Sequence, residues 1–396
     1  MSKQRLQRFA FLFLFPVLIT VTACSQQAVK PVASGRIVEV TIPAPSLAGN
    51  LLGDPTEQPM SIYLPPGYET SSDKRYPVLY LLHGFKGTNR TWMLDPALVA
   101  SGPLPDLPDG GTYGHEGKLK RDRLDAIIAS GVIPELIVVA PNAWNAYKHS
   151  FYVNSVVTGN WEDYIVRDVV GYVDANYRTL PQAASRGIGG HSGGGNGSLY
   201  LGIRHPDIFG SVYAMAPCCT GSMFSMPPFE SDDTGELTPF WRNVFTRLHA
   251  LASKEELPAA RLSIQEDFWI NANLASGAAY SPNPDRPPLY ADYLYEQRDG
   301  EFARNEAAFE RRQANWIYHM FDEYEDNLRA LRGLLIDYGE HEIESLAVGN
   351  AELAEALGQK GIPFILEVYA GGNHGNMVTE RMETRGFEFF AEMLEF

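Results

Sequence analysis

Short apolar runs alternate along this chain with stretches in which apolar residues recur at helical spacing. Residues 76–82 and 136–140 are almost continuously apolar, as is typical of strands that are covered on both faces. Between residues 161 and 176 an apolar side chain recurs at every fourth position, which indicates a helix with one buried face. The alternation predicts an α/β fold, with a mostly parallel central sheet flanked by helices.

The weaker runs complete this pattern at both ends of the chain. Residues 37–42 and 60–64 are expected to form early antiparallel strands. The remaining predicted strands are residues 185–190, 211–216, 334–338 and 363–369, with helices over 197–204 and 383–394.

Residues 221–332 interrupt the alternation. The segment opens with Met, Pro and Phe, contains a proline-rich run at 280–288, and ends in charged, aromatic and helix-prone sequence. An insertion at this point of an open α/β sheet hangs over the carboxyl ends of the strands, where such sheets bind ligands. We therefore predict a largely helical cap between two core segments, residues 36–220 and 333–396.

The first residues have the pattern of an export signal. Basic side chains precede an apolar stretch at 9–22 that is short for a membrane span. The stretch ends in Val21-Thr22-Ala23-Cys24, which resembles the cleavage site of a bacterial lipoprotein. Residues 1–23 are thus expected to be a signal peptide, and Cys24 the lipidated first residue of the mature chain. A plain secretory signal or an uncleaved anchor is the alternative.

Residues 24–35 are rich in small and polar side chains, and we expect them to tether the folded part to a membrane. The residue after Cys24 is Ser25 rather than Asp, and the lipoprotein resemblance then favours the outer membrane. The expected location is the cell envelope, lipid-anchored, at the outer membrane or facing the periplasm.

Composition excludes several classes of partner and cofactor. The 48 acidic and 32 basic residues give a net charge of −16, which argues against binding to nucleic acid or to an anionic lipid surface. With Cys24 lipidated, the remaining cysteines are the adjacent pair Cys218 and Cys219. A disulfide framework is therefore excluded, and reduced thiols are expected rather than a strained vicinal disulfide. No spacing typical of metal ligands occurs, so no metal or other cofactor is expected.

The glycine-rich segment at 189–195 carries the strongest candidate chemistry. It contains Gly190-His191-Ser192-Gly193-Gly194, a Gly-x-Ser-x-Gly pattern between a predicted strand and a predicted helix. In a nucleophile elbow this pattern turns strand into helix so sharply that the serine projects from the turn. Glycine is required where strand and helix pass closest. Ser192 is therefore the candidate nucleophile.

A serine hydroxyl needs a general base and two N–H donors for the oxyanion that its attack creates. Of the histidines after Ser192, His374 alone lies in a glycine-rich loop just beyond a predicted strand, and it is the candidate base. Gly193 supplies one N–H from the elbow. Phe85, which lies three positions after the apolar strand 76–82, is the candidate for the second N–H. His83, which directly follows that strand, is expected to have a structural role.

The candidate acid lies in the segment 336–342, which follows the penultimate strand in chain order. Asp337, Glu340 and Glu342 compete for this role. Asp337 falls within or at the end of the strand, whereas Glu342 lies past a turn glycine. Spacing alone does not choose between Asp337 and Glu342.

Several longer motifs together give the chain a family resemblance. They are YLPPGY at 63–68, YPVLYLLHG at 76–84, WEDY at 161–164, DANYR at 174–178, the Ser192 elbow and the His374 loop. With these, the chain resembles the esterase D family of α/β-hydrolases. The family includes feruloyl and acetylxylan esterases, S-formylglutathione hydrolases, enterochelin esterases and mycolyltransferases. The resemblance covers nearly all of the expected mature chain except the insertion.

The resemblance implies a serine carboxylic-ester hydrolase that acts through an acyl-enzyme on a small-molecule or carbohydrate-linked ester, without a cofactor. The family's Asp-x-Gly-x-x-Asp pattern maps its acid onto Glu342, with Glu in place of the usual Asp, and leaves Asp337 as the alternative. Two other functions remain open. They are acyl transfer to a sugar or lipid acceptor with the same triad, and a non-catalytic surface-binding lipoprotein.

Overall fold

The computed structural model describes residues 34–94, 118–221, 230, 236–256 and 267–396. The predicted signal peptide, Cys24 and most of the predicted tether lie outside these ranges. No helix within them is both long and apolar enough to cross a bilayer.

The central element is an eight-stranded sheet with the order β1-β2-β4-β3-β7-β8-β11-β12. The strands are β1 (Arg36–Pro43), β2 (Glu57–Leu64), β3 (Val78–Leu82), β4 (Ile137–Pro141), β7 (Arg186–His191), β8 (Ser211–Met215), β11 (Gly333–His341) and β12 (Ile365–Asn373). Both pairings of β2, with β1 and with β4, are antiparallel. All pairings from β4 to β12 are parallel, which confirms the predicted fold class.

Period-two alternation along β3 divides the core into two layers. Val78, Tyr80 and Leu82 belong to one buried cluster, and Leu79 and Leu81 belong to the other. Because successive strand side chains point to opposite faces, an unbroken apolar run is what a sheet covered on both faces requires.

Different helices supply the partner side chains for the two faces. The cluster on the first face contains residues of α3 (Trp161–Asp163), α4 (Val170–Asn176) and α5 (Gly193–Arg204). The cluster on the second face contains residues of α2 (Arg121–Ala129) and α14 (Phe387–Met393). A π-helical turn, Tyr164–Val169, joins α3 to α4, and another, Met382–Gly386, lies between α13 (Val378–Arg381) and α14. The motifs did not predict α2 or α12 (Glu344–Gln359).

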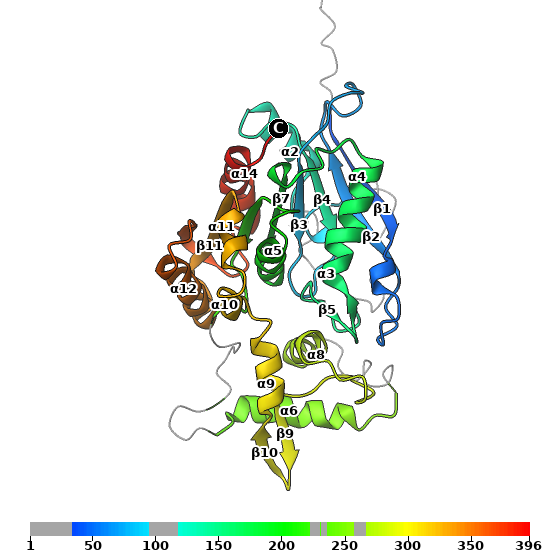
Figure 1. Ribbon diagram of the computed structural model, residues 1–396, viewed down its shortest axis with the longest axis vertical. Coiled ribbons are helices and arrows are strands. Elements are labelled where there is room, and N and C mark those ends of the chain that lie inside the picture. The colour runs from blue at the N-terminus through cyan, green and yellow to red at the C-terminus, as the bar shows by residue number, and fades with distance from the viewer. Residues whose placement is uncertain (1–33, 95–117, 222–229, 231–235, 257–266) are drawn as a thin grey trace, which may run out of the picture. The chain divides into compact units, whose positions relative to one another are not determined.

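The segment predicted as a cap consists of two parts. The first comprises α6 (Pro239–Ala252), α8 (Phe268–Tyr280), the hairpin β9 (Tyr295–Arg298) and β10 (Glu301–Arg304), and α9 (Glu306–Gln313). These elements lie below the sheet in Figure 1. The second part, α10 (Ile317–Met320) and α11 (Glu325–Ala330), packs against α5 instead. The chain has thus returned to the core before β11 begins.

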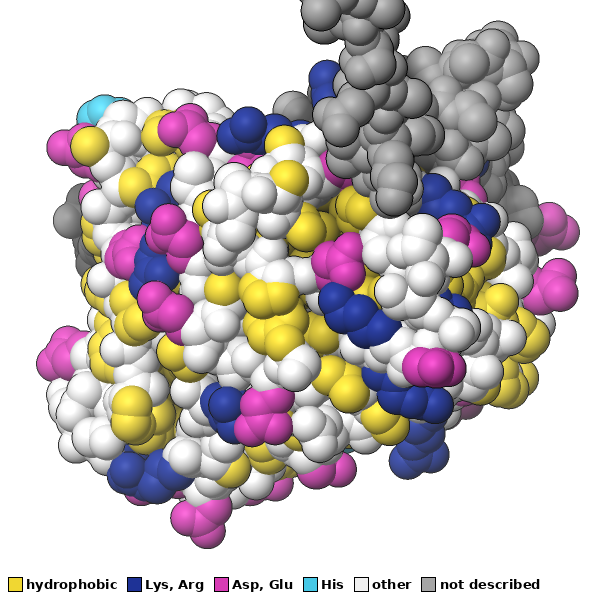
Figure 2. Space-filling model, turned by 90° about the horizontal axis from the view of Figure 1, so that it is seen from above, with side chains coloured by type: hydrophobic (Ala, Val, Ile, Leu, Met, Phe, Trp, Pro, Cys, Tyr) yellow, Lys and Arg dark blue, Asp and Glu magenta, His cyan; other side chains and the backbone are white. Residues whose placement is uncertain are grey.

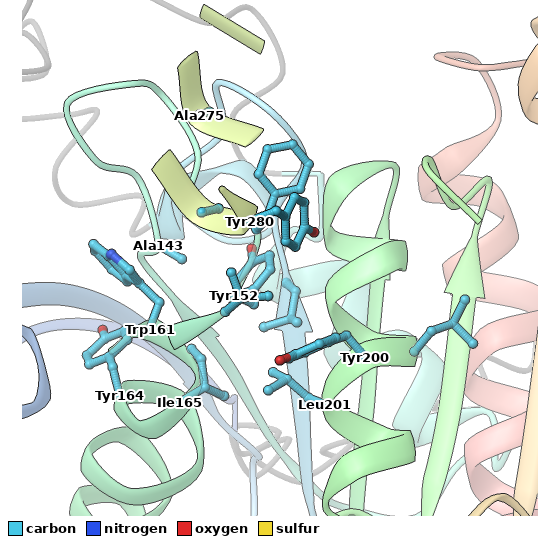
Figure 3. Close-up of a cluster of buried hydrophobic side chains, with 14 of the residues drawn as sticks. Ala143, Tyr152, Trp161, Tyr164, Ile165, Tyr200, Leu201, Ala275 and Tyr280 are labelled. Atoms are coloured by element: carbon cyan, nitrogen blue, oxygen red, sulfur yellow. The ribbon is translucent and has the colours of Figure 1, made fainter. Parts of the chain in front are cut away.

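The first part of the cap shares its buried residues with the core. Tyr280 of α8 lies beside Phe151, with ring centroids 5.3 Å apart, and Ser155 Oγ donates to the Ala278 carbonyl at 2.5 Å. Figure 3 shows Tyr280 close to Tyr152, above the aromatic side chains of the core. One continuous apolar cluster thus includes core and cap, and it fixes α8 over the sheet.

Charged side chains of both signs mix on the surface. On the face seen in Figure 2, which is at the top of Figure 1, acidic and basic groups are interspersed among apolar patches. Exposed ion pairs such as Arg332–Glu395 at 2.9 Å add to this mixture. This face therefore carries no extended field of one sign, despite the net charge of −16.

The closest approach of helix to sheet lies at the start of α5. A side-chain carbon on Gly194 would overlap the backbone at Leu82 and His83, and one on Gly190 would lie 2.5 Å from the Gly194 carbonyl carbon. Real Cβ atoms do not approach backbone so closely, so α5 packs against β3 and β7 only because these residues are glycine.

We predict that Gly194→Ala lowers the free energy of unfolding by about 1–3 kcal/mol, because strand and helix must separate to admit the methyl group. Urea unfolding followed by circular dichroism measures the change. Gly171→Ala is the matched control, because Gly171 is an exposed residue of α4 where the added methyl group would have no neighbouring atom within 4 Å. It should leave stability unchanged or raise it by up to about 1 kcal/mol. Equal effects of the two substitutions would contradict the prediction.

Candidate active site

Ser192 occupies the turn between β7 and α5 in a strained conformation. Its φ of 58° and ψ of −118° are unusual for a residue with a side chain. Two backbone hydrogen bonds hold it there, from Ser192 N to Met215 O at 3.0 Å and from Cys218 N to Ser192 O at 3.2 Å. The geometry is that of the predicted nucleophile elbow, with the hydroxyl at the N-terminal end of α5.

The base and acid candidates leave two neighbouring strands side by side. His341 of β11 and Asn373 of β12 are register partners beyond an irregularity in the pairing. The next residues along the chain, Glu342 and His374, therefore emerge together at the carboxyl edge of the sheet. Gly339 and Gly372 have no side chains, so the two strands can approach closely at this point.

His374 reaches the elbow from this edge. Its Nε2 lies 2.9 Å from Ser192 Oγ. The loop that carries it is fixed by Asn373, whose side-chain oxygen accepts from the amides of Gly375 and Asn376, both at 3.0 Å. The His191 Nε2 contact with the His374 carbonyl at 2.6 Å ties the same loop to β7.

Glu342 lies on the other side of the imidazole. Its Oε1 is 3.0 Å from His374 Nδ1, and its side chain is 0% exposed. The N–H of Nδ1 is not aligned on that oxygen, so the contact has the separation of a hydrogen bond without its linear geometry. The amide of Ile343 donates to the same Oε1 at 2.7 Å and orients the carboxylate.

The alternative acid, Asp337, has other partners. It lies inside β11, where it accepts hydrogen bonds from the Tyr213 hydroxyl at 2.7 Å and from Arg381 Nε at 2.8 Å. Burial raises the pKa of Asp337 to about 6. The third competitor, Glu340, is exposed and accepts from the Gly371 amide at 3.2 Å. Among the described acidic residues, Glu342 alone contacts His374.

The two oxyanion candidates face the same small space beside Ser192. A side-chain carbon on Gly193 would lie 3.4 Å from the Phe85 amide nitrogen. Within the described residues neither amide donates a hydrogen bond to another backbone group. Lys86, with φ of 63°, turns the chain directly after Phe85, and the Gly87 amide closes the turn on Gly84 O at 2.9 Å. Both N–H groups are thus available to a ligand.

A cavity of about 510 Å³ opens over these groups. Its described lining includes Ser192, His374 and the Phe85 loop on the core side, and Trp241, Phe268 and Trp269 on the cap side. The aromatic residues give it a largely apolar wall. Trp316, another aromatic residue of the segment predicted as a cap, is buried and is not among the described lining residues.

The cavity also contains polar residues that no motif predicted. His149 is fully buried, and this burial lowers its pKa to about 3. Lys118 is mostly buried, and its pKa falls to about 8 for the same reason. Both lie in segments without periodicity, so the sequence carried no signal for them.

The thiols of Cys218 and Cys219 are free, with their sulfurs 3.0 Å apart, and both residues line the cavity. His83 is buried and its Nε2 accepts from the Ala143 amide at 2.8 Å. This bond joins the end of β3 to the segment that follows β4.

The sheet order, the elbow and the imidazole at its carboxyl edge define an α/β-hydrolase. The model of the family described as "Putative esterase" matches residues 55–377. The chain belongs to this family, which confirms the resemblance seen in its sequence.

Curated relatives match through shorter segments. An S-formylglutathione hydrolase of Arabidopsis thaliana is 28% identical over 165 residues, which cover 40% of this chain and 50% of that protein. An endo-1,4-beta-xylanase/feruloyl esterase of Xylanibacter ruminicola is 26% identical over 185 residues, 46% of this chain and 21% of that one. The matched segments thus span half or less of the length of these relatives.

Solved structures share the fold over most of the chain. A ferulic acid esterase aligns with a TM-score of 0.54 and 20% identity, covering 91% of this chain and 99% of its own. An S-formylglutathione hydrolase from Agrobacterium tumefaciens aligns with a TM-score of 0.52 and 15% identity, covering 92% and 97%. At such identities the likeness establishes the fold.

Substitutions of the two candidate acids, Glu342 and Asp337, should have different effects on catalysis. Glu342→Gln should lower kcat for ester hydrolysis by roughly 10²–10⁴-fold, because the imidazole loses the carboxylate that orients it and stabilises its charge. Asp337→Asn should leave kcat within a few-fold, because its partners are Tyr213 and Arg381. Steady-state kinetics on an aryl acetate compare the two variants, with circular dichroism to verify folding. The opposite ranking would exclude Glu342 as the acid.

Proposed function

We propose that this protein is a serine carboxylic-ester hydrolase in which Ser192, His374 and Glu342 form the catalytic triad. One observation carries the proposal. A single imidazole lies 2.9 Å from the hydroxyl of an elbow serine and 3.0 Å from a buried carboxylate. A hydroxyl, a base and an orienting acid in this order are what nucleophilic acyl transfer requires.

In the first half-reaction Ser192 Oγ attacks the ester carbonyl carbon while His374 Nε2 takes the hydroxyl proton. Collapse of the tetrahedral intermediate breaks the carbon–oxygen bond to the alcohol, and the imidazolium returns the proton to that leaving oxygen. The alcohol departs and the acyl group remains on Ser192. Glu342 keeps the imidazole oriented and stabilises its positive charge.

The second half-reaction repeats these steps with water. His374 Nε2 takes a proton from the water as its oxygen attacks the acyl-enzyme, and returns it to Ser192 Oγ as the acid leaves. In both halves the negative charge develops on the former carbonyl oxygen. In this scheme the amides of Phe85 and Gly193 donate to that oxygen. The scheme needs no metal or other cofactor.

The cavity supports an ester with an apolar or aromatic portion. Its volume of about 510 Å³ is suited to a small organic substrate, and Trp241, Phe268 and Trp269 supply flat apolar surface. Relatives of this chain are named as a feruloyl esterase and as an S-formylglutathione hydrolase. We place the substrate of this protein among small-molecule or carbohydrate-linked esters.

The proposal includes a place in the cell envelope. The basic, apolar and Cys24-containing pattern of the first residues supports export and lipidation. Acyl chains on Cys24 would hold the catalytic domain at a membrane surface, in reach of extracytoplasmic esters.

A fluorophosphonate probe tests the nucleophile. The wild-type protein should be labelled, and Ser192→Ala should not, because the probe bonds to an activated serine oxygen. Ser192→Ala and His374→Ala should lower kcat by roughly 10⁴–10⁶-fold. His319→Ala is the control, because His319 is a cap-segment histidine that is not among the described residues lining the cavity.

A folded wild-type protein that is never labelled would overturn the proposed hydrolase and leave the binding function. Product analysis with added alcohols separates hydrolysis from acyl transfer. New esters formed at the expense of free acid would identify a transferase with the same triad.

We predict that the full-length protein incorporates radiolabelled palmitate in a bacterial host and sediments with membranes. Cys24→Ser should abolish both, because the lipidated thiol is lost. Cys218→Ser is the matched control and should retain them. Release of a soluble protein by wild type and Cys24→Ser alike would indicate a plain secretory signal.

A further inference from the structure

His149 is a buried histidine that the proposed triad does not use. It is fully buried, and it lines the same cavity as Ser192 and His374. The rings of Phe151 and Tyr152 contact it edge-on, with centroids 4.9 and 5.3 Å away. The ring of Phe85 lies 5.8 Å away. Aromatic packing on several sides holds the imidazole in one orientation.

The hydrogen bonds of this ring determine which nitrogen carries the proton. The Phe151 amide donates to Nδ1 at 3.0 Å, so Nδ1 is the acceptor nitrogen. A neutral imidazole with an acceptor Nδ1 carries its hydrogen on Nε2. Burial holds the pKa of His149 at about 3, so the ring is neutral at physiological pH and Nε2 is an N–H donor.

Among the described residues, that donor contacts a single acceptor, and the contact is weak. Its contact with the His83 carbonyl is 3.5 Å long, at the limit for a hydrogen bond. The same carbonyl already accepts from the Tyr152 hydroxyl at 2.7 Å. The Nε2–H group is therefore left with most of its capacity to donate to a ligand in the cavity.

His149 Nε2 lies next to the amides of Phe85 and Gly193, the two candidate donors to the oxyanion. A side-chain carbon on Gly193 would lie 2.8 Å from His149 Nε2 and 3.4 Å from the Phe85 amide nitrogen. His149 Nε2 and the Phe85 amide nitrogen thus both lie beside Gly193, whose own amide is the other oxyanion candidate. All three residues line the cavity over Ser192.

We infer that His149 is a further catalytic residue, whose neutral imidazole donates a third hydrogen bond to the oxyanion formed on attack by Ser192. The inference rests on the proposed function, since it assigns a role within the same reaction. A neutral donor suits this position. An imidazolium would be costly in so buried a site, whereas a fixed N–H dipole stabilises developing charge without reorganising.

The test compares His149→Phe with His149→Gln. Phenylalanine keeps the ring and its packing but removes the donor, whereas the glutamine amide places an N–H near the position of Nε2. We expect His149→Phe to lower kcat for an aryl acetate by roughly 10–10²-fold with little change in KM. His149→Gln should recover a substantial part of that loss. His249→Phe, a half-buried cap histidine that contacts Tyr293 and Phe302, is the matched control and should retain wild-type kcat.

An arylboronic acid supplies a second readout, because it adds to the serine as a tetrahedral anion. Its Kd should rise in His149→Phe by a factor similar to the loss in kcat/KM, while the carboxylic acid product binds as in wild type. A kcat within threefold of wild type in a folded His149→Phe protein would overturn the inference alone. Equal losses in the Phe and Gln variants would assign His149 a packing role. Absence of fluorophosphonate labelling in wild type would overturn the proposed function, and this inference with it.

Discussion

The site depends on the close contact between the first turn of α5 and the ends of β3 and β7. Gly190 and Gly194 leave no side chain between strand and helix, so the chain reverses within one residue and Ser192 takes its strained φ of 58°. The same contact places the N-terminal amides of α5 beside the Phe85 turn. The exposed position of Ser192 and the placement of the candidate oxyanion amides therefore follow from one steric condition, the absence of Cβ atoms at the crossing.

Long-range partners reach the elbow because the sheet is parallel at this point. Strands β7, β8, β11 and β12 all end at one edge, so residues almost two hundred positions apart meet there. Pairing of His341 with Asn373 then brings Glu342 and His374 out together. The cap contributes an apolar wall to the cavity but no residue of the proposed triad. Phe268 of α8 packs on the Phe85 ring at 5.2 Å, which couples the oxyanion turn to the aromatic lining of the cavity.

Much of this arrangement could be predicted from the sequence, because Ser192, Phe85 and His374 each lie in a glycine-containing segment that closely follows a predicted strand. The acid could not be chosen from spacing. Asp337 and Glu342 are five positions apart in the sequence. In the structure Asp337 lies inside β11 and contacts Arg381, whereas Glu342 follows the end of the strand. His149 was beyond sequence reasoning, since nothing local marks a buried imidazole between β4 and α3. Its position follows from packing among residues distant in the chain.

The first turn of α5 consists of glycines, and their lack of side chains has a consequence for the divergence of this family. Gly193 and the His149 imidazole compete for one small volume, since a carbon on the first would lie 2.8 Å from the ring of the second. The two positions should therefore covary among homologues. A side chain after the nucleophile would require the imidazole to move or to be replaced by a smaller side chain.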